Sequence, residues 1–148
     1  MSPIQAKRKS HLPVLIALGS IACVIVVVIV LAISHMQERK RIRNLRNPVP
    51  ATTAALVDGA QLYQQHCQNC HGAKGDGKGQ RAAELSTAPS DFTEPSHWRN
   101  VTDGEIYWQI TKGQQPMPAF EDKLNEEQRW ETVNFIRTFA QKSGAASQ

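Results

Sequence analysis

Apolar and polar positions divide this chain into one long apolar stretch and several shorter amphipathic ones. Residues 12–33 carry no charged side chain. As a helix, this stretch would span roughly 33 Å at about 1.5 Å per residue, enough to cross the hydrocarbon core of a bilayer. The pattern therefore predicts one transmembrane helix over residues 12–34. The helix is expected to continue out of the membrane through the basic residues 37–47.

Beyond residue 50 the apolar residues follow helical spacing. The pattern predicts one helix over residues 56–70, a second over 103–112 and a third that ends near Phe139. No run of alternating apolar residues is bounded by turn residues, so we expect an all-α domain. Residues 72–101 are rich in Gly, Pro, Ser and Asp and are expected to form long loops.

Capping signals mark the starts of the last two helices. Thr102 with Glu105, and Asn125 with Gln128, have the spacing of capping boxes. Gly113 is expected to end the second helix. Along the third helix the apolar residues cover more than half of the circumference, which indicates packing on two sides, against another helix and a cofactor.

Two prolines separate the basic stretch from the globular part and predict a short tether after residue 47. The expected organisation is a basic segment at 1–11, a transmembrane helix at 12–34, a basic juxtamembrane segment and linker at 35–54, a globular domain at 55–142 and a tail at 143–148.

A cleavable signal peptide is the alternative to a retained helix, because Lys7, Arg8 and Lys9 precede the apolar run. A signal has an apolar stretch of only about 7–15 residues, and residues 33–36 make a poor cleavage site. Residues 20–23 resemble a lipoprotein box, but an apolar run follows Cys23 where a lipoprotein would turn polar. Cys23 is therefore expected to be a small apolar side chain in the bilayer.

Charge is distributed unevenly between the two parts. Residues 1–50 hold eight Lys/Arg and one acid, a net +7, whereas residues 51–148 hold nine Lys/Arg and twelve Asp/Glu, a net −3. The folded part thus lacks the basic surface of a nucleic-acid-binding protein. The basic residues flank the apolar helix as lipid-headgroup anchors do. Their count after the helix would by itself place the C-terminal part in the cytoplasm.

The chemistry is concentrated in Cys67-Gln-Asn-Cys70-His71. The spacing C-x-x-C-H is the attachment signature of c-type haem. Residues three and four apart share one helix face, so both thiols can reach one edge of a porphyrin and the histidine can present a nitrogen to its iron.

Three other interpretations of these residues are open. A thioredoxin-like redox site would need a βαβ context, which the pattern does not predict. A zinc site could add His66, but four ligands within six residues cannot easily surround a tetrahedral metal. A simple disulfide would explain Cys67 and Cys70 but not His71.

Met117 is the candidate for the opposite side of the iron. It is the one methionine in residues 51–148 and lies between Pro116 and Pro118, which stiffen the backbone. The alternative is that Met117 fills the core, as methionines often do. His66 and His97 are weaker candidates and are expected to be solvated.

Taken together, residues 55–140 resemble the class I cytochrome c family. The resemblance rests on the helix before the attachment residues, the glycine-rich loop after them, the capped helix, the methionine loop and the last helix: Asp58–Tyr63, Cys67–Gly72, Gly75–Gly79, Thr102–Ile106, Gly113–Phe120, Trp130 and Phe135-Ile136. It implies an all-α fold around one covalently attached haem c, with His71 and Met117 on the iron.

The resemblance also implies contacts inside the domain. First and last helices should cross with Gly59 and Tyr63 against Trp130, Val133 and Phe135. The carbonyl of Pro89 should accept a hydrogen bond from the His71 ring. Four further side chains are expected near the haem pocket, namely Trp98, Arg99, Tyr107 and Trp108.

The expected function is that of an electron carrier, not an enzyme, which exchanges single electrons with redox partners or a larger membrane complex. Because the family attaches its haem outside the bacterial inner membrane, the domain is expected on the periplasmic side. A haem protein with an open axial site, such as a gas sensor or a peroxidase, is the first alternative. A structural subunit whose haem only stabilises the fold is the second.

Overall fold

The computed structural model describes residues 12–145, with side chains from residue 17 to residue 140. The predicted segment 1–11 and residues 146–148 of the predicted tail lie outside this range. Residues 12–145 form helices and loops without a strand, which confirms the all-α class. The chain divides into two units, Met1–Lys40 and Arg41–Gln148, and each is described by itself.

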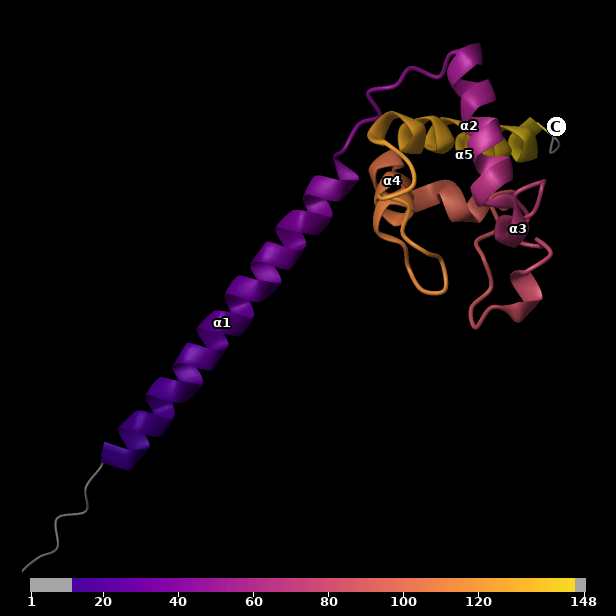
Figure 1. Cartoon of the computed structure of the whole chain (residues 1–148). Helices are drawn as coiled ribbons and strands as arrows, with labels where there is room; N and C mark the ends of the chain where they lie inside the picture. The colour runs from indigo at the N-terminus through magenta and orange to yellow at the C-terminus, as the bar shows by residue number, and fades with distance from the viewer. Residues whose placement is uncertain (1–11, 146–148) are drawn as a thin grey trace, which may run out of the picture. The chain divides into compact units, whose positions relative to one another are not determined.

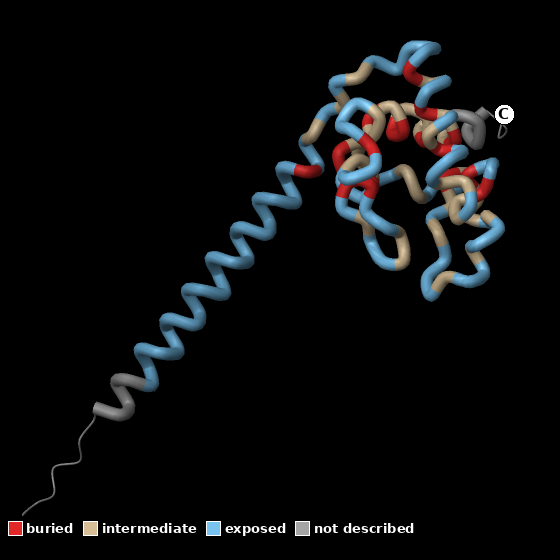
Figure 2. The backbone as a smooth tube through the Cα atoms, viewed as in Figure 1, coloured by how far each residue is buried: buried red, intermediate tan, exposed pale blue. Residues whose placement is uncertain are grey.

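Helix α1, Leu12–Arg43, contains the whole apolar run. Every side chain from Ala17 to Lys40 is exposed (Figure 2). By length and composition, Ala17–Arg43 qualifies as a helix that could cross a membrane. The expected continuation through the basic residues is correct as far as Arg43, after which the chain turns.

In the part of the globular unit that the structure describes, up to residue 145, there are four helices, α2 to α5, and two 3₁₀ turns. Figure 1 labels the helices. The helices are α2, Thr53–His66; α3, Gln68–His71; α4, Asp103–Lys112; and α5, Glu126–Ala145. The 3₁₀ turns, η1 (Ala82–Glu84) and η2 (Pro95–Asn100), lie within the region predicted as long loops.

Both predicted capping boxes are present. The Glu105 carboxylate accepts a hydrogen bond from the Thr102 N–H at 2.8 Å, and the Thr102 hydroxyl accepts one from the Glu105 N–H at 3.3 Å. Asn125 and Gln128 exchange the same pair of bonds, both at 2.9 Å. Gly113, with φ of 70°, ends α4 as predicted.

Three helix boundaries differ from the prediction. The first helix of the globular unit begins at Thr53 and not at residue 56. Residues 56–70 do not form one helix, because φ of Cys67 reaches −117° and interrupts the ladder between α2 and α3. Helix α5 does not end near Phe139 but runs to Ala145. The apolar pattern fades at Phe139, but the sequence offers no proline there, and a helix can continue once its face leaves the core.

The crossing of α2 and α5 closes the core. A side chain at Gly59 would collide with the carbonyl of Glu131, so the helices approach closely only because this residue is glycine. The Tyr63 ring lies 5.3 Å from the rings of Phe135 and Phe139. The predicted crossing through Gly59 and Tyr63 is therefore correct.

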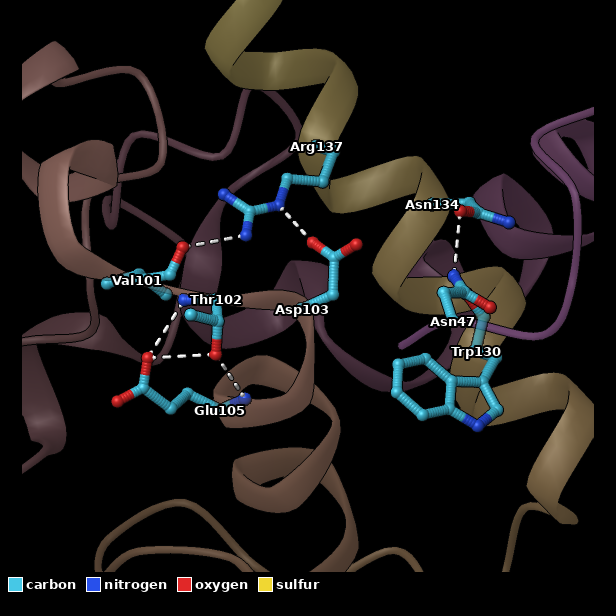
Figure 3. A network of polar contacts seen from close by, with 8 residues as sticks. All are labelled: Asn47, Val101, Thr102, Asp103, Glu105, Trp130, Asn134 and Arg137. Carbon is cyan, nitrogen blue, oxygen red and sulfur yellow. Dashed lines mark hydrogen bonds and ion pairs between the residues drawn. The ribbon is translucent and has the colours of Figure 1, made fainter. Parts of the chain in front are cut away.

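Helix α4 packs on the other side of α5. The rings of Tyr107 and Trp130 are stacked at 4.1 Å. Arg137 joins the same helices at a second point (Figure 3): it donates to Asp103 Oδ1 at 2.6 Å and to the Val101 carbonyl at 2.8 Å. Trp130, expected at the α2 crossing, stacks on Tyr107 of α4.

Candidate haem site

The two cysteines lie at the break between α2 and α3. Cys67 is the last cap of α2, and its carbonyl accepts hydrogen bonds from the N–H groups of Cys70 and His71, at 3.1 and 2.9 Å. This tight turn brings both thiols and the histidine within one helical turn. Both cysteines are partly buried and free, so they are not joined as a disulfide.

The Cys67 thiol lies in an apolar setting. Burial is the main reason that its pKa rises to about 12, with the neighbouring Cys70 as the second. A thiol with a raised pKa stays protonated at neutral pH, whereas reactive disulfide-exchange cysteines need the thiolate. The thioredoxin-like interpretation therefore loses support. Within residues 12–145, no three His, Cys, Asp or Glu side chains are grouped as a metal would require.

His71 is held by the loop that follows it. Its Nδ1 lies 3.4 Å from the Ser90 carbonyl, and its ring stacks on Phe92 at 4.8 Å and 13°. The prediction that the Pro89 carbonyl is the acceptor was wrong by one residue. The Pro89 carbonyl instead lies against Gly77, and a Cβ on Gly77 would be only 2.7 Å from its oxygen. Because successive carbonyls of a loop point in different directions, only one of them can face the ring.

The environment of His71 suits a neutral ligand. Burial lowers the pKa of this imidazole more than the hydrogen bond to the Ser90 carbonyl raises it, and nearby His97 adds to the lowering, which favours the uncharged ring. A proton on Nδ1, bonded to the Ser90 carbonyl, leaves the lone pair of Nε2 for a metal.

Backbone contacts fix the loop around this turn. The Tyr63 hydroxyl donates to the Gly72 carbonyl at 2.8 Å, and burial raises the pKa of this phenol, so it remains a donor. Gly72 has φ of 80°, and a side chain there would meet the Asp76 carboxylate. A Cβ on Gly79 would collide with the Asn69 carbonyl. These glycines let the loop close tightly over the attachment turn.

Met117 lies in a second tight turn. Its N–H donates to the Gln114 carbonyl at 2.8 Å, and its own carbonyl accepts from the Gln114 N–H at 3.0 Å. Gly113 begins the turn with φ of 70°, and Phe120 ends it, buried and bonded through its N–H to the Ile110 carbonyl at 3.0 Å. The thioether side chain is partly buried against the core.

The fold brings the two turns to one core. Cys67 and Met117 both pack against the same cluster of buried side chains. The rings of His66 and Phe120 meet edge to face at 5.9 Å, so the residue before Cys67 contacts the turn of Met117. His66 is exposed, as expected, and its ring also contacts this turn.

Of the other expected pocket residues, Trp98 and Tyr107 are packed against the core, while Trp108 is 36% exposed. Trp98 donates through its ring nitrogen to the Phe92 carbonyl at 2.9 Å. Arg99 is exposed. His97, expected to be solvated, packs edge to face on Trp98 at 4.8 Å.

Phe92 is the contributor that the sequence did not reveal. It is buried, its ring stacks on His71, and it also contacts His97, Trp98 and Phe139. The one signal was an isolated large apolar residue inside a polar loop, which periodicity does not register.

The residues present fit a covalently attached haem. Two thiols and an imidazole lie within one turn, and the imidazole is neutral with one nitrogen occupied by a carbonyl. A partly buried thioether reaches the same core from a turn more than forty residues along the chain. This donor set, sulfur and nitrogen with no carboxylate, is typical of haem iron.

Comparisons with known proteins point in the same direction. The family model described as cytochrome C oxidase, cbb3-type, subunit III matches residues 54–136. Cytochrome c6 from Nostoc sp. (strain PCC 7120) is 30% identical over 87 residues, which cover 59% of this chain and 73% of that relative.

Two solved structures are similar in fold. One belongs to the reducing HAO-like protein complex of Kuenenia stuttgartiensis, with a TM-score of 0.55 and 25% identity. The match covers 62% of this chain but only 46% of that one. The KustC0563 c-type cytochrome has a TM-score of 0.50 and 31% identity, with 55% of this chain and 96% of the neighbour covered.

Proposed function

We propose that this chain, which belongs to the family described as cytochrome C oxidase, cbb3-type, subunit III, is a membrane-anchored carrier of single electrons. As a class I c-type cytochrome it holds haem c covalently and takes part in electron transfer. The anchor, the ligands and the partners are our proposals. The observation that carries them is the convergence of the Cys67–His71 turn and the Met117 turn on one core.

Each residue of the site has a distinct role. Cys67 and Cys70 would hold the porphyrin through thioether bonds. His71 would bind the iron through Nε2, with its tautomer set by the Ser90 carbonyl. Met117 would bind the opposite face from a turn that two backbone hydrogen bonds close.

This ligand set favours outer-sphere electron transfer. Haem iron, when bound, exchanges one electron between its ferric and ferrous states. His71 and Met117 would occupy both axial positions and leave none for a substrate. The neutral, soft thioether of Met117 would favour the ferrous state, and the buried rings around His71 would exclude water.

Helix α1 is proposed as the membrane anchor, with the haem domain on the periplasmic side. Its apolar length and the exposure of Ala17–Lys40 support a lipid environment. The periplasmic side follows from the chemistry, since haem c is attached outside the inner membrane in this family. This overrides the count of basic residues after the helix.

The proposed partners are redox proteins of the same membrane. The fold resembles a chain from a multi-protein complex, which agrees with docking to a larger assembly. Transient electron-transfer partners usually meet through a small interface, below about 1,200 Å².

Expression of the full chain in a host that attaches haem c tests this function. We expect the intact mass to increase by one haem, the protein to stay in the membrane fraction, and the reduced form to bind carbon monoxide slowly or not at all. Cys23→Ala should keep the haem, whereas Cys67→Ala with Cys70→Ala should lose it. Rapid carbon monoxide binding by the unaltered protein would favour an open-site haem protein instead.

A further inference from the structure

Residues 41–50, here called the strap, comprise the last three residues of α1 and the segment that leads toward α2. They precede residues 54–136, where the family model matches, so the family gives them no role. The sequence predicted that they would include part of a short tether. In the structure, however, the strap lies against α4 and α5 through apolar, polar and ionic contacts.

The apolar contacts are close. Ile42 is buried at 9% exposure, and Leu45 and Val49 pack against the core. Gly104, in the first turn of α4, lies directly under the strap: a side chain there would collide with the Ile42 carbonyl and lie 2.8 Å from Leu45 Cβ. The strap therefore fits only because α4 has a glycine at this point.

Two asparagines fix the position of the strap on α5 (Figure 3). The Asn47 amide donates to Asn134 Oδ1 at 2.8 Å and to the Trp130 carbonyl at 3.2 Å. The Asn134 amide in turn donates to the Val49 carbonyl at 3.0 Å. Asn47 Oδ1 accepts from the Val49 N–H at 2.9 Å. The side-chain amides of Asn47 and Asn134 thus each donate and accept hydrogen bonds, and together they hold the strap backbone on α5.

An ion pair completes the attachment. Arg43 lies 2.8 Å from Glu105, the same carboxylate group that caps α4. The two side chains are 49% and 29% exposed, so the pair contributes little free energy and mainly selects the register.

We propose that the strap is a docked part of the haem domain and that it shortens the connection between the domain and α1. Undocked, the seven strap residues that follow α1, 44–50, would behave as a coil with a reach of roughly 15 Å. When the strap is docked, most of this possible separation between α1 and the domain is lost. Given the proposed anchor, the domain would then meet partners that present their docking site close to the same membrane, not partners reached by swinging on a tether.

Trypsin offers a direct test, because two of the three arginines of the strap, Arg43 and Arg46, lie between its packed residues Ile42 and Val49. The full-length, haem-loaded protein in detergent micelles is digested briefly, and cleavage after each arginine is followed by mass spectrometry. Proteolysis of a docked segment tracks the population of its open form. We expect both bonds to be protected in the unaltered protein.

Three variants sharpen the test. Asn47→Ala should raise cleavage after Arg46 about tenfold, since two hydrogen bonds to α5 are lost. Asn44→Ala is the matched control, because Asn44 is an exposed strap residue, and should leave the rate unchanged. Gly104→Ala should also raise cleavage, although alanine normally stabilises a helix relative to glycine.

The outcomes separate the strap from the proposed function. Cleavage after Arg46 that is equally fast in the unaltered protein and in Asn47→Ala would overturn the docked strap. So would a Gly104→Ala protein that is more stable and no faster to cleave. Haem content and the carbon monoxide reaction report on the proposed function separately, and we expect the strap variants to leave both unchanged.

Discussion

His71 and Met117 lie on one core but are held in different ways. His71 belongs to a helical turn, and its ring is fixed by a stacked phenylalanine and a carbonyl from a loop about twenty residues away. Met117 belongs to a four-residue turn closed by its own backbone, between two prolines. The histidine side thus depends on tertiary packing, and the methionine side on local backbone geometry. Substitutions near His71 and near Met117 should therefore have different effects on the haem site.

The largest effect is expected on the histidine side. His71→Ala removes the proposed iron ligand from the attachment turn, so most of the low-spin haem spectrum should be lost even where the thioether bonds form. Absorption spectra and haem content per protein measure this. His66→Ala, which changes a histidine of α2 that contacts Phe120, is the control and should retain the spectrum. Equal losses in both variants would contradict the assignment of His71.

Met117→Ala should leave the haem attached but open one axial position. Because the thioether favours ferrous iron, we expect the reduction potential to fall by on the order of a tenth of a volt or more, within the roughly 0.8 V over which axial ligands tune haems. Carbon monoxide should bind the reduced variant rapidly. An unchanged potential and slow binding would mean that Met117 is only a core residue.

Gly113→Ala tests whether the backbone alone holds the methionine turn. Alanine at φ of 70° costs about 1–2 kcal/mol, and its Cβ would lie 2.6 Å from the Ala119 nitrogen and 2.8 Å from the Met117 carbonyl. We expect a lower thermal midpoint and faster carbon monoxide binding, with the haem retained. Gly19→Ala, where a side chain meets nothing within 4 Å, should change neither measurement.

Phe92→Leu should have the smallest effect and act on the histidine side. The change keeps most of the core volume but removes the ring that stacks on His71, so a loss of about 1–2 kcal/mol in the free energy of unfolding is expected. The reduction potential should shift less than in Met117→Ala. Phe135→Leu, on the Tyr63 side of α5, is matched in chemistry and should cost stability without moving the potential.

The sequence predicted those features of the fold that are formed by residues close together along the chain. The capping boxes at Thr102 and Asn125 and the stop at Gly113 could be predicted because each is made within one helical turn. The C-x-x-C-H turn could be predicted for the same reason. The break at Cys67 could not, since a change in one φ angle leaves the apolar pattern intact.

Long-range contacts were less predictable. The choice of Ser90 over Pro89 depends on which loop carbonyl faces His71, and no side chain encodes that direction. Phe92 and the strap are set by tertiary packing between segments far apart in the sequence. Only the crossing of α2 and α5 was predicted at long range, because a glycine and an aromatic residue at helical spacing matched a known family.

The crossing of α2 and α5 also affects the order in which the protein can be made. Helix α5 follows α2 by some sixty residues along the chain, so Gly59 and Tyr63 stay uncovered until α5 has been synthesised. Contacts of such large sequence separation slow the folding of a domain as a whole. Until the two helices pair, the Cys67–His71 segment has no finished core to bury it, and we expect it to be accessible for attachment of the cofactor. The helix pairing that shields the site in the mature molecule is therefore also what delays its closure.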